Sequence, residues 1–215
     1  MRKGHKALGV KAAQIASLAA KLGRLAPKQK VGTRDLPRLW LVTDPNRLAD
    51  PREAAAQLPP GSGIIYRGFG RPEADQEAMA LAKLAKVRGL ILLIGADAAL
   101  AQRVGADGVH LPERLVIRAR RIRARHQGWI VTAAAHSRAA LARAQTLGLD
   151  AAFVSTVFQS LSPSAGALLG PVKLAGWTRH SSLPIIALGG IDAKTGKRLI
   201  ATGVYGLAAI EGLKT

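Results

Sequence analysis

The chain lacks several residue types and patterns, and each absence limits what the protein can be. It contains no cysteine among its 215 residues, which excludes disulfide bonds, thiolate nucleophiles and thiolate metal sites. No apolar run reaches the roughly 18 residues that a membrane-spanning helix needs. The beginning of the chain also lacks the compact apolar stretch of a secretion signal. We therefore expect a soluble cytoplasmic protein that does not act in a membrane.

Aromatic residues are scarce, at 4% of the chain, although 48% of all residues are hydrophobic. Alanine, leucine, valine and isoleucine supply most of this content, as is typical where a parallel sheet packs against helices. A chain of this length and composition can bury one full core. We therefore expect one α/β core.

Acidic residues are missing from the first 34 positions, which hold nine Lys or Arg, and the whole chain has a net charge of +19. A second basic cluster, from Arg118 to Arg125, falls on an expected helix whose apolar face contains Leu115, Ala119 and Ile122. Such a cluster can bind nucleic acid or a membrane surface, or it can be a solvated helix face. No aromatic platform or nucleic-acid motif accompanies the arginines. The solvated face is therefore favoured, and nucleic acid is not an expected partner.

Short β-type runs alternate with helical patterns from residue 39 onward. The expected strands cover 39–43, 63–67, 90–94, 108–111, 129–133, 151–155, 184–188 and 205–209, and the expected helices cover 51–58, 73–87, 97–104, 115–126, 137–147, 168–180 and 192–202. The strands are nearly unbroken apolar runs, as expected when both faces of a parallel sheet are buried. Eight such repeats predict a (β/α)8 TIM barrel. A doubly wound sheet is the alternative, but its glycine-rich first turn is replaced here by Thr43-Asp44-Pro45.

The last repeat lacks its helix, because only residues 210–215 follow the eighth expected strand. Residues 8–25 carry apolar side chains at helical spacing and could cover the seam between the last and first strands. A disordered basic tail is the competing interpretation. We therefore divide the chain into a basic helical extension with a linker, residues 1–35, and a barrel, residues 36–215.

Residues 185–192 read Ile-Ile-Ala-Leu-Gly-Gly-Ile-Asp. A predicted strand ends there at two glycines, and regular structure begins again at an aspartate that can cap a helix. Adjacent glycines let a backbone approach an anion closely, and free amide groups at a helix start favour negative charge. Many βα barrels bind phosphate at this place, between the seventh and eighth strands. A tight turn that simply needs glycine is the other interpretation of Gly189 and Gly190.

The strand-end motifs together resemble those of the thiamine-phosphate synthase and TenI (thiazole tautomerase) family. The resemblance covers residues 39 to about 213 and implies a (β/α)8 barrel that acts in thiamine biosynthesis. The motifs are Leu39-Trp40-Leu41-Val42-Thr43-Asp44, Gly105-Ala106-Asp107-Gly108-Val109-His110-Leu111, Ala135-His136-Ser137, Asp150 and Ala187-Leu188-Gly189-Gly190-Ile191.

The resemblance also implies a magnesium site that this sequence has not kept in register. Family synthases couple a pyrimidine pyrophosphate to a thiazole phosphate with Mg²⁺ held by aspartates after the third and fourth strands. The matching positions here hold Gly95-Ala96 and Leu115, while Asp97 and Glu113 stand nearby but out of register. Magnesium needs hard oxygen ligands such as carboxylates. We expect no metal held by the protein, and Mg²⁺ only if the chain is a synthase.

The pyrophosphate-binding pattern is reduced as well. Arg67 is kept, but Ile65 and Phe69 occupy the positions of the family's glutamine and lysine. The threonine-rich, lysine-bearing loop after the sixth strand becomes 159–164, which keeps the hydroxyls of Ser160 and Ser162 and has no lysine. A departing pyrophosphate needs cationic stabilisation, so these changes argue against synthase chemistry.

His136 fits the tautomerase branch better. The resemblance implies that it shuttles a proton when a thiazole becomes aromatic, a task for a group that titrates near neutrality. A structural histidine beside the cap Ser137 is the alternative, and His110 is expected to be a packed histidine. Glu211 stands near the expected phosphate, where the family has a small hydroxyl residue, so either the site is altered or Glu211 turns outward.

These observations lead to one hypothesis and two alternatives. The first is a family barrel whose tautomerase-like or degenerate site binds a thiazole phosphate. The others are an active Mg²⁺-dependent thiamine-phosphate synthase and a non-catalytic barrel that binds phosphate or polyanions. A homo-oligomer is compatible with all three. The candidate catalytic residue is His136, and the candidate ligand-binding residues are Arg67, Ser160, Ser162, Gly189, Gly190 and Ile210.

Overall fold

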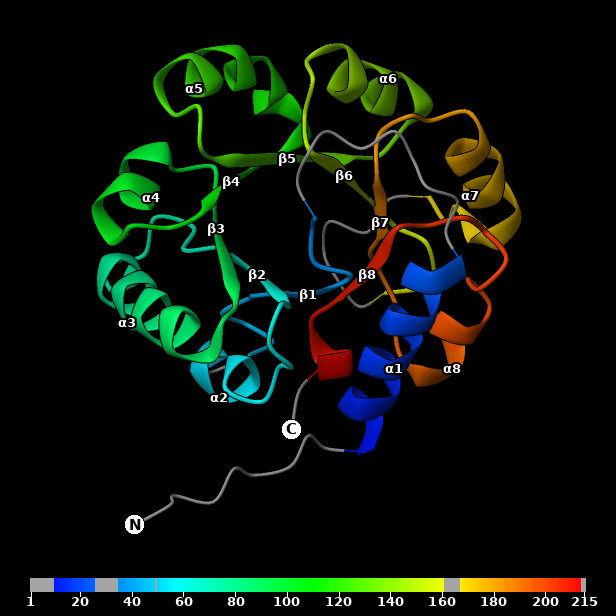
Figure 1. Cartoon of the computed structure of the whole chain (residues 1–215), viewed down its shortest axis with the longest axis horizontal. Helices are drawn as coiled ribbons and strands as arrows, with labels where there is room; N and C mark the ends of the chain where they lie inside the picture. Colours follow the sequence, from blue (N-terminus) through cyan, green and yellow to red (C-terminus); the bar gives the residue numbers. More distant parts are fainter. Residues whose placement is uncertain (1–9, 26–34, 49, 161–166, 214–215) are drawn as a thin grey trace.

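Eight parallel strands close into a barrel in the computed structural model, which describes residues 10–25, 35–48, 50–160 and 167–213. Each strand pairs with the next along the chain, and β8 pairs with β1 to close the ring (Figure 1). The predicted (β/α)8 TIM barrel is therefore confirmed. The strands are β1 (Leu39–Val42), β2 (Gly63–Tyr66), β3 (Ile91–Gly95), β4 (Gly108–Leu111), β5 (Ile130–Ala135), β6 (Ala151–Val154), β7 (Ile185–Ala187) and β8 (Gly206–Ala209).

Side chains at alternate positions of each strand point into the barrel and fill its interior. Trp40 is fully buried there, and its ring meets that of Phe153 edge-on at 5.3 Å between centroids. Gly63 on the neighbouring strand gives the indole its room, because a Cβ at Gly63 would lie 2.1 Å from Trp40 Cε3. The interior is thus a packed core, and a ligand site is expected at the carboxyl-end mouth rather than inside the barrel.

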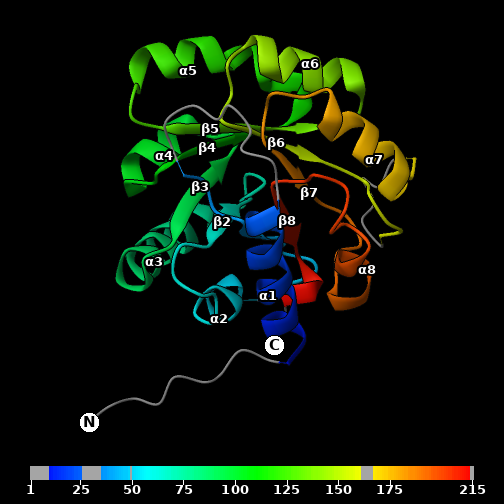
Figure 2. The ribbon, with the colours of Figure 1, turned by 45° about the vertical axis from the view of Figure 1, so that its right-hand side comes forward.

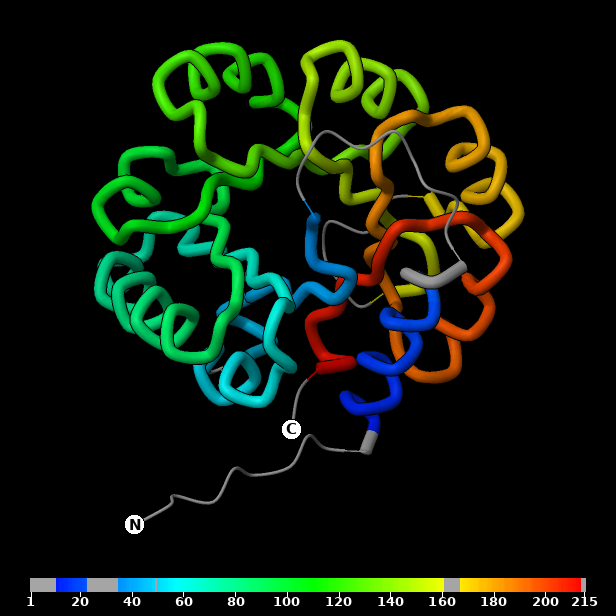
Figure 3. The backbone as a smooth tube through the Cα atoms, in the orientation of Figure 1, coloured from blue at the N-terminus to red at the C-terminus, as the bar shows by residue number. Residues whose placement is uncertain are grey.

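Helices surround the barrel in the order expected of alternating units, as the tube in Figure 3 shows. They are α2 (Pro51–Ala55), α3 (Ala74–Arg88), α4 (Ala98–Val104), η1 (Glu113–Arg118), α5 (Ala119–Arg125), α6 (Arg138–Thr146), α7 (Gly170–Arg179), α8 (Ala193–Lys197) and η2 (Glu211–Leu213).

Three helices differ most from their predicted extents. The helix expected over 51–58 ends at Ala55 as α2. The single helix expected over 115–126 begins two residues earlier as the 3₁₀ helix η1 and continues as α5. The helix expected over 192–202 ends at Lys197, after which the amides of Arg198 and Leu199 bond back only three residues. Gly196, in this last part of α8, packs against Leu18 of the N-terminal helix.

The N-terminal helix α1 (Val10–Leu25) packs against β1, β8, α8 and η2, and Figures 1 and 2 both show it beside β8 and α8. Its buried face consists of Ala12, Ile15, Leu18, Ala19 and Leu22. The helix therefore covers the seam where the eighth repeat has no long helix of its own. Of the residues described, no helix combines the length and apolarity needed to cross a bilayer.

Candidate functional site

A cavity of about 1450 Å³ opens at the carboxyl ends of the strands, and all eight strand ends contribute to it. Its inner wall is apolar and includes Val42, Ile65, Ile94, Leu188 and Ile210. Ligand pockets of this kind commonly combine an apolar wall with a few polar groups that fix the ligand's orientation. The polar groups at this mouth therefore determine what the cavity can bind.

The Gly189–Gly190 corner packs tightly on the loop that follows β6. Both glycines have positive φ angles, +97° and +63°, and a Cβ on Gly190 would lie 2.3 Å from the Gln159 carbonyl oxygen. Packing alone thus requires both glycines. The argument for a ligand is different: Gly189 lines the cavity, and neither glycine amide donates a hydrogen bond within the described chain.

The start of α8 contributes less than the sequence suggested. The Asp192 carboxylate accepts hydrogen bonds from the amides of Lys194 and Thr195, both at 2.7 Å. Thr195 completes a capping box by bonding back to the Asp192 amide. These helix amides are satisfied by the protein itself, so any anion at this corner would rely on the loop amides.

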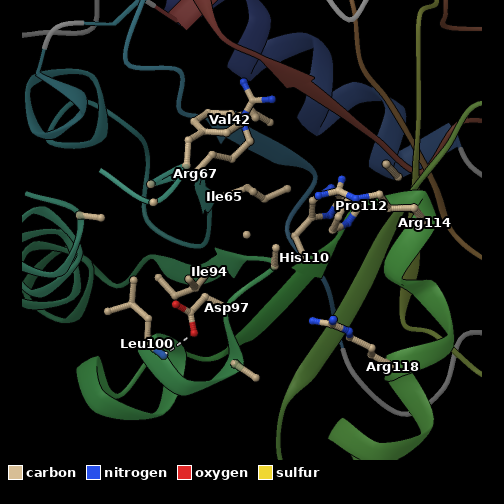
Figure 4. A pocket seen from close by; sticks show the side chains of 18 of the residues that line it. Val42, Ile65, Arg67, Ile94, Asp97, Leu100, His110, Pro112, Arg114 and Arg118 are labelled. Carbon is tan, nitrogen blue, oxygen red and sulfur yellow. Dashed lines mark hydrogen bonds between the residues drawn. The ribbon is translucent and has the colours of Figure 1, made fainter. Parts of the chain in front are cut away.

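Arg67 follows β2 and supplies a positive charge to the inner part of the mouth. Its Nε donates to the Thr43 carbonyl oxygen at 2.7 Å, and Nη2 lies 3.1 Å from Asp44 Oδ2. Burial lowers the pKa of the guanidinium, while Asp44 opposes that change; an arginine nonetheless stays charged. Figure 4 shows Arg67 beside Val42 and Ile65 at the wall of the cavity.

His110 at the end of β4 also lines the cavity and is a neutral imidazole at physiological pH. Burial, together with the charges of Arg67 and His136, lowers its pKa from 6.5 to about 3. Its Nδ1 lies 2.9 Å from Thr132 Oγ1, and its ring packs edge-on against Phe153. The expected packed histidine is thus also a group that faces the ligand space.

His136, just after β5, lines the same cavity and is held at two points. Its amide donates to Glu113 Oε2 at 2.9 Å, and its Nδ1 lies 3.1 Å from the Ser155 carbonyl oxygen. Ser155 Oγ also lies 3.2 Å from Nδ1, so both Ser155 oxygens contact this ring nitrogen, and the carbonyl oxygen can only accept a proton from it. With the proton on Nδ1, the lone pair lies on Nε2, the arrangement that a proton acceptor needs.

The remaining predicted site residues divide between the cavity and its surroundings. Ser160 and Ile210 line the cavity, while Ser162 lies outside the described residues. Glu211 pairs with Arg47, with Nη2 2.9 Å from Oε2 and Nε 3.1 Å from Oε1. This two-point ion pair neutralises the carboxylate that the sequence placed next to the expected phosphate.

The carboxylates near the mouth do not fit a magnesium ion. The side chain of Asp97 caps α4 by accepting from the Leu100 amide at 2.8 Å (Figure 4), and Glu113 accepts from the His136 amide. Across the described residues, no three carboxylate or imidazole side chains converge in a way that could hold a metal. The position of Leu115 supplies no oxygen at all. The protein's own donors therefore give Mg²⁺ no dedicated site.

Sequence reasoning missed one feature of the mouth. Most arginines on η1 and α5 are exposed, as the favoured solvated helix face requires, and four of them also line the cavity. They are Arg114, Arg118, Arg121 and Arg125. The spacing of Arg118, Arg121 and Arg125 was the available signal, because it places them on one face of an α-helix.

The fold and the cavity together define a (β/α)8 barrel with a ligand-sized cavity at the carboxyl ends of its strands. Residues 39–213 match the family model described as thiamine monophosphate synthase. A thiamine-phosphate synthase of Thioalkalivibrio sulfidiphilus is 34% identical over 185 residues, covering 81% of this chain and 86% of the relative. One of Thiobacillus denitrificans is 35% identical over 166 residues, covering 75% and 78%. The chain therefore belongs to the thiamine monophosphate synthase family.

The solved structures agree on the fold. The thiamine phosphate pyrophosphorylase of Pyrococcus furiosus superimposes with a TM-score of 0.70 at 22% identity, covering 81% of this chain and 85% of that chain. The predicted family is thus confirmed, and the chain is a barrel of thiamine biosynthesis.

Proposed function

We propose that the chain binds a thiazole phosphate in the barrel mouth and isomerises it by proton transfer without a metal. The observation that carries the proposal is the meeting of three groups on one cavity: the Gly189 amide, the neutral His110 ring and the His136 ring. A loop amide can bind a phosphate oxygen, and an imidazole can accept and return a proton.

The proposed reaction needs no co-reactant. His136 Nε2 takes a proton from a ring carbon of the thiazole phosphate carboxylate, and the same or a neighbouring group returns a proton elsewhere on the ligand. The product is the aromatic isomer, so atoms and charge balance. Arg67 offers a cation to the ligand's carboxylate, while Ser160 and the backbone near Ile210 would contribute to phosphate binding.

The test measures isomerisation of the thiazole phosphate carboxylate in EDTA with the wild-type chain and His136→Ala. We expect metal-independent turnover that falls by about 10²-fold or more in His136→Ala, a typical loss for a removed general acid–base group. His180→Ala is the matched control, because His180 is an exposed histidine that does not line the cavity. Absence of turnover in the wild-type chain would contradict the proposal.

A second candidate is Mg²⁺-dependent thiamine-phosphate synthase activity, which the names of the relatives favour. The magnesium would lack the protein carboxylates described above, which argues against it. Release of pyrophosphate from a pyrimidine pyrophosphate and a thiazole phosphate, only when Mg²⁺ is present, would establish this candidate instead. Binding of the thiazole phosphate with no turnover in either assay would leave a non-catalytic binding barrel.

A further inference from the structure

The arginine face, defined as Arg114, Arg118, Arg121 and Arg125, forms one wall of the outer part of the cavity. Figure 4 shows Arg114 and Arg118 extending from η1 toward the cavity that His110 also faces. The opposite wall comes from α4 and includes Ala98, Ala99 and Gln102. The cavity thus continues outward from the barrel mouth as a groove with one strongly basic side.

The charges on this face are not neutralised by the protein. None of the four guanidinium groups makes a hydrogen bond or ion pair with another residue of the described segments. Their neighbour Arg123, which points away from the groove, is paired with Asp150 at 2.9 Å. The acidic residues of the groove are engaged elsewhere, since Asp75 pairs with Arg103 and Asp97 caps α4.

The length of the arginine face suggests the shape of its ligand. Eleven residues separate the first and last arginine, which corresponds to roughly 16 Å of helix. A single phosphoryl group can contact only one or two of these side chains, whereas an extended chain of phosphates can contact them all. Guanidinium groups match phosphate oxygens in geometry and need no metal to do so.

We infer that the arginine face is a metal-independent binding site for a linear phosphate chain, which runs from the barrel mouth outward between α4 and α5. This site is separate from the thiazole phosphate site proposed at Gly189. Its basic wall begins on η1, the 3₁₀ helix that also carries Leu115. The phosphate chain binds along η1 and α5 and exchanges with solvent at the open side of the groove.

The test is calorimetric titration of the full chain with tripolyphosphate and with long-chain polyphosphate in EDTA. The double variant Arg118→Gln/Arg121→Gln should weaken polyphosphate binding by about tenfold or more, because two charge-assisted contacts are lost. Arg143→Gln/Arg179→Gln is the matched control: both arginines are exposed, neither lines the groove, and the charge change is the same. The control should bind within about twofold of wild type, as expected for charges far from the site.

Other results would overturn the inference. Equal losses in the two double variants would mean that the net charge of +19 attracts anions without a site. Binding that requires Mg²⁺ would contradict the metal-independent site. Single-stranded oligonucleotide binding that depends on Arg118 and Arg121, with no polyphosphate binding, would assign the face to nucleic acid instead. Thiazole phosphate binding, measured in the same variants, should be unchanged, so the two proposals can fail separately.

Discussion

The substitution Ile15→Ala tests whether α1 is an integral part of the barrel. Ile15 is fully buried, and its Cδ1 lies 3.0 Å from the position a Cβ would take on Gly212, next to β8. Truncating a buried Ile to Ala removes apolar burial and leaves a cavity, at a cost of about 2–5 kcal/mol. For a protein of this size, each kcal/mol lowers Tm by roughly 2–4 °C. We therefore expect a fall in Tm of roughly 6–12 °C for a loss of about 3 kcal/mol.

Thermal unfolding followed by far-UV circular dichroism measures this change in one cooperative transition. Gln14→Ala is the control, because Gln14 is exposed on the same helix and alanine is a good helix former. Its Tm should stay close to that of wild type. If Ile15→Ala also unfolds at the wild-type temperature, α1 does not contribute to the stability of the barrel and the seam between β8 and β1 needs no cover.

Three further predictions concern the mouth. Arg47→Ala should weaken the binding of a phosphate ligand, because the Glu211 carboxylate then loses its arginine partner. The double variant Arg47→Ala/Glu211→Gln should restore the affinity. Equal affinity in wild type and both variants would show that the ion pair does not affect ligand binding. Gly190→Ala should lower Tm, since its Cβ would meet the Gln159 carbonyl at 2.3 Å, and an unchanged Tm would show that the corner can relax. The folded-state pKa of His110 lies below its ordinary value, so its contribution to stability is present above pH 6.5 and is lost as pH falls toward 3. Urea unfolding should show the free energy of unfolding declining by up to about 1.4 kcal/mol per pH unit in that window, and less in His110→Gln; identical declines would contradict the assignment.

Much of the fold could be predicted from the sequence, because buried parallel strands appear as short apolar runs. The strand runs ending near Val42, Ile94 and Leu111 correspond to β1, β3 and β4 within a residue or two. The early end of α8 could not be predicted. The helix ends where Leu18 approaches Gly196, a contact between segments almost 180 residues apart in the chain that no local pattern reveals.

The site was predictable only in part. Strand-end motifs identified His136, Arg67 and Gly189, and all of them line the cavity, although their roles remain proposals. The pairing of Glu211 with Arg47 follows from the neighbouring positions of β8 and β1 in the closed barrel, which no local pattern indicates. The arginine face is exposed, as the sequence predicted, but composition shows only the charge and not the cavity that these side chains line.

Turnover of a thiazole phosphate carboxylate in EDTA tests the central account most directly. The account predicts that the aromatic isomer forms at the same rate with and without Mg²⁺ and that His136→Ala slows the reaction by about 10²-fold or more. A chain that is inert in EDTA and that, on addition of Mg²⁺, joins a pyrimidine pyrophosphate to a thiazole phosphate would contradict it.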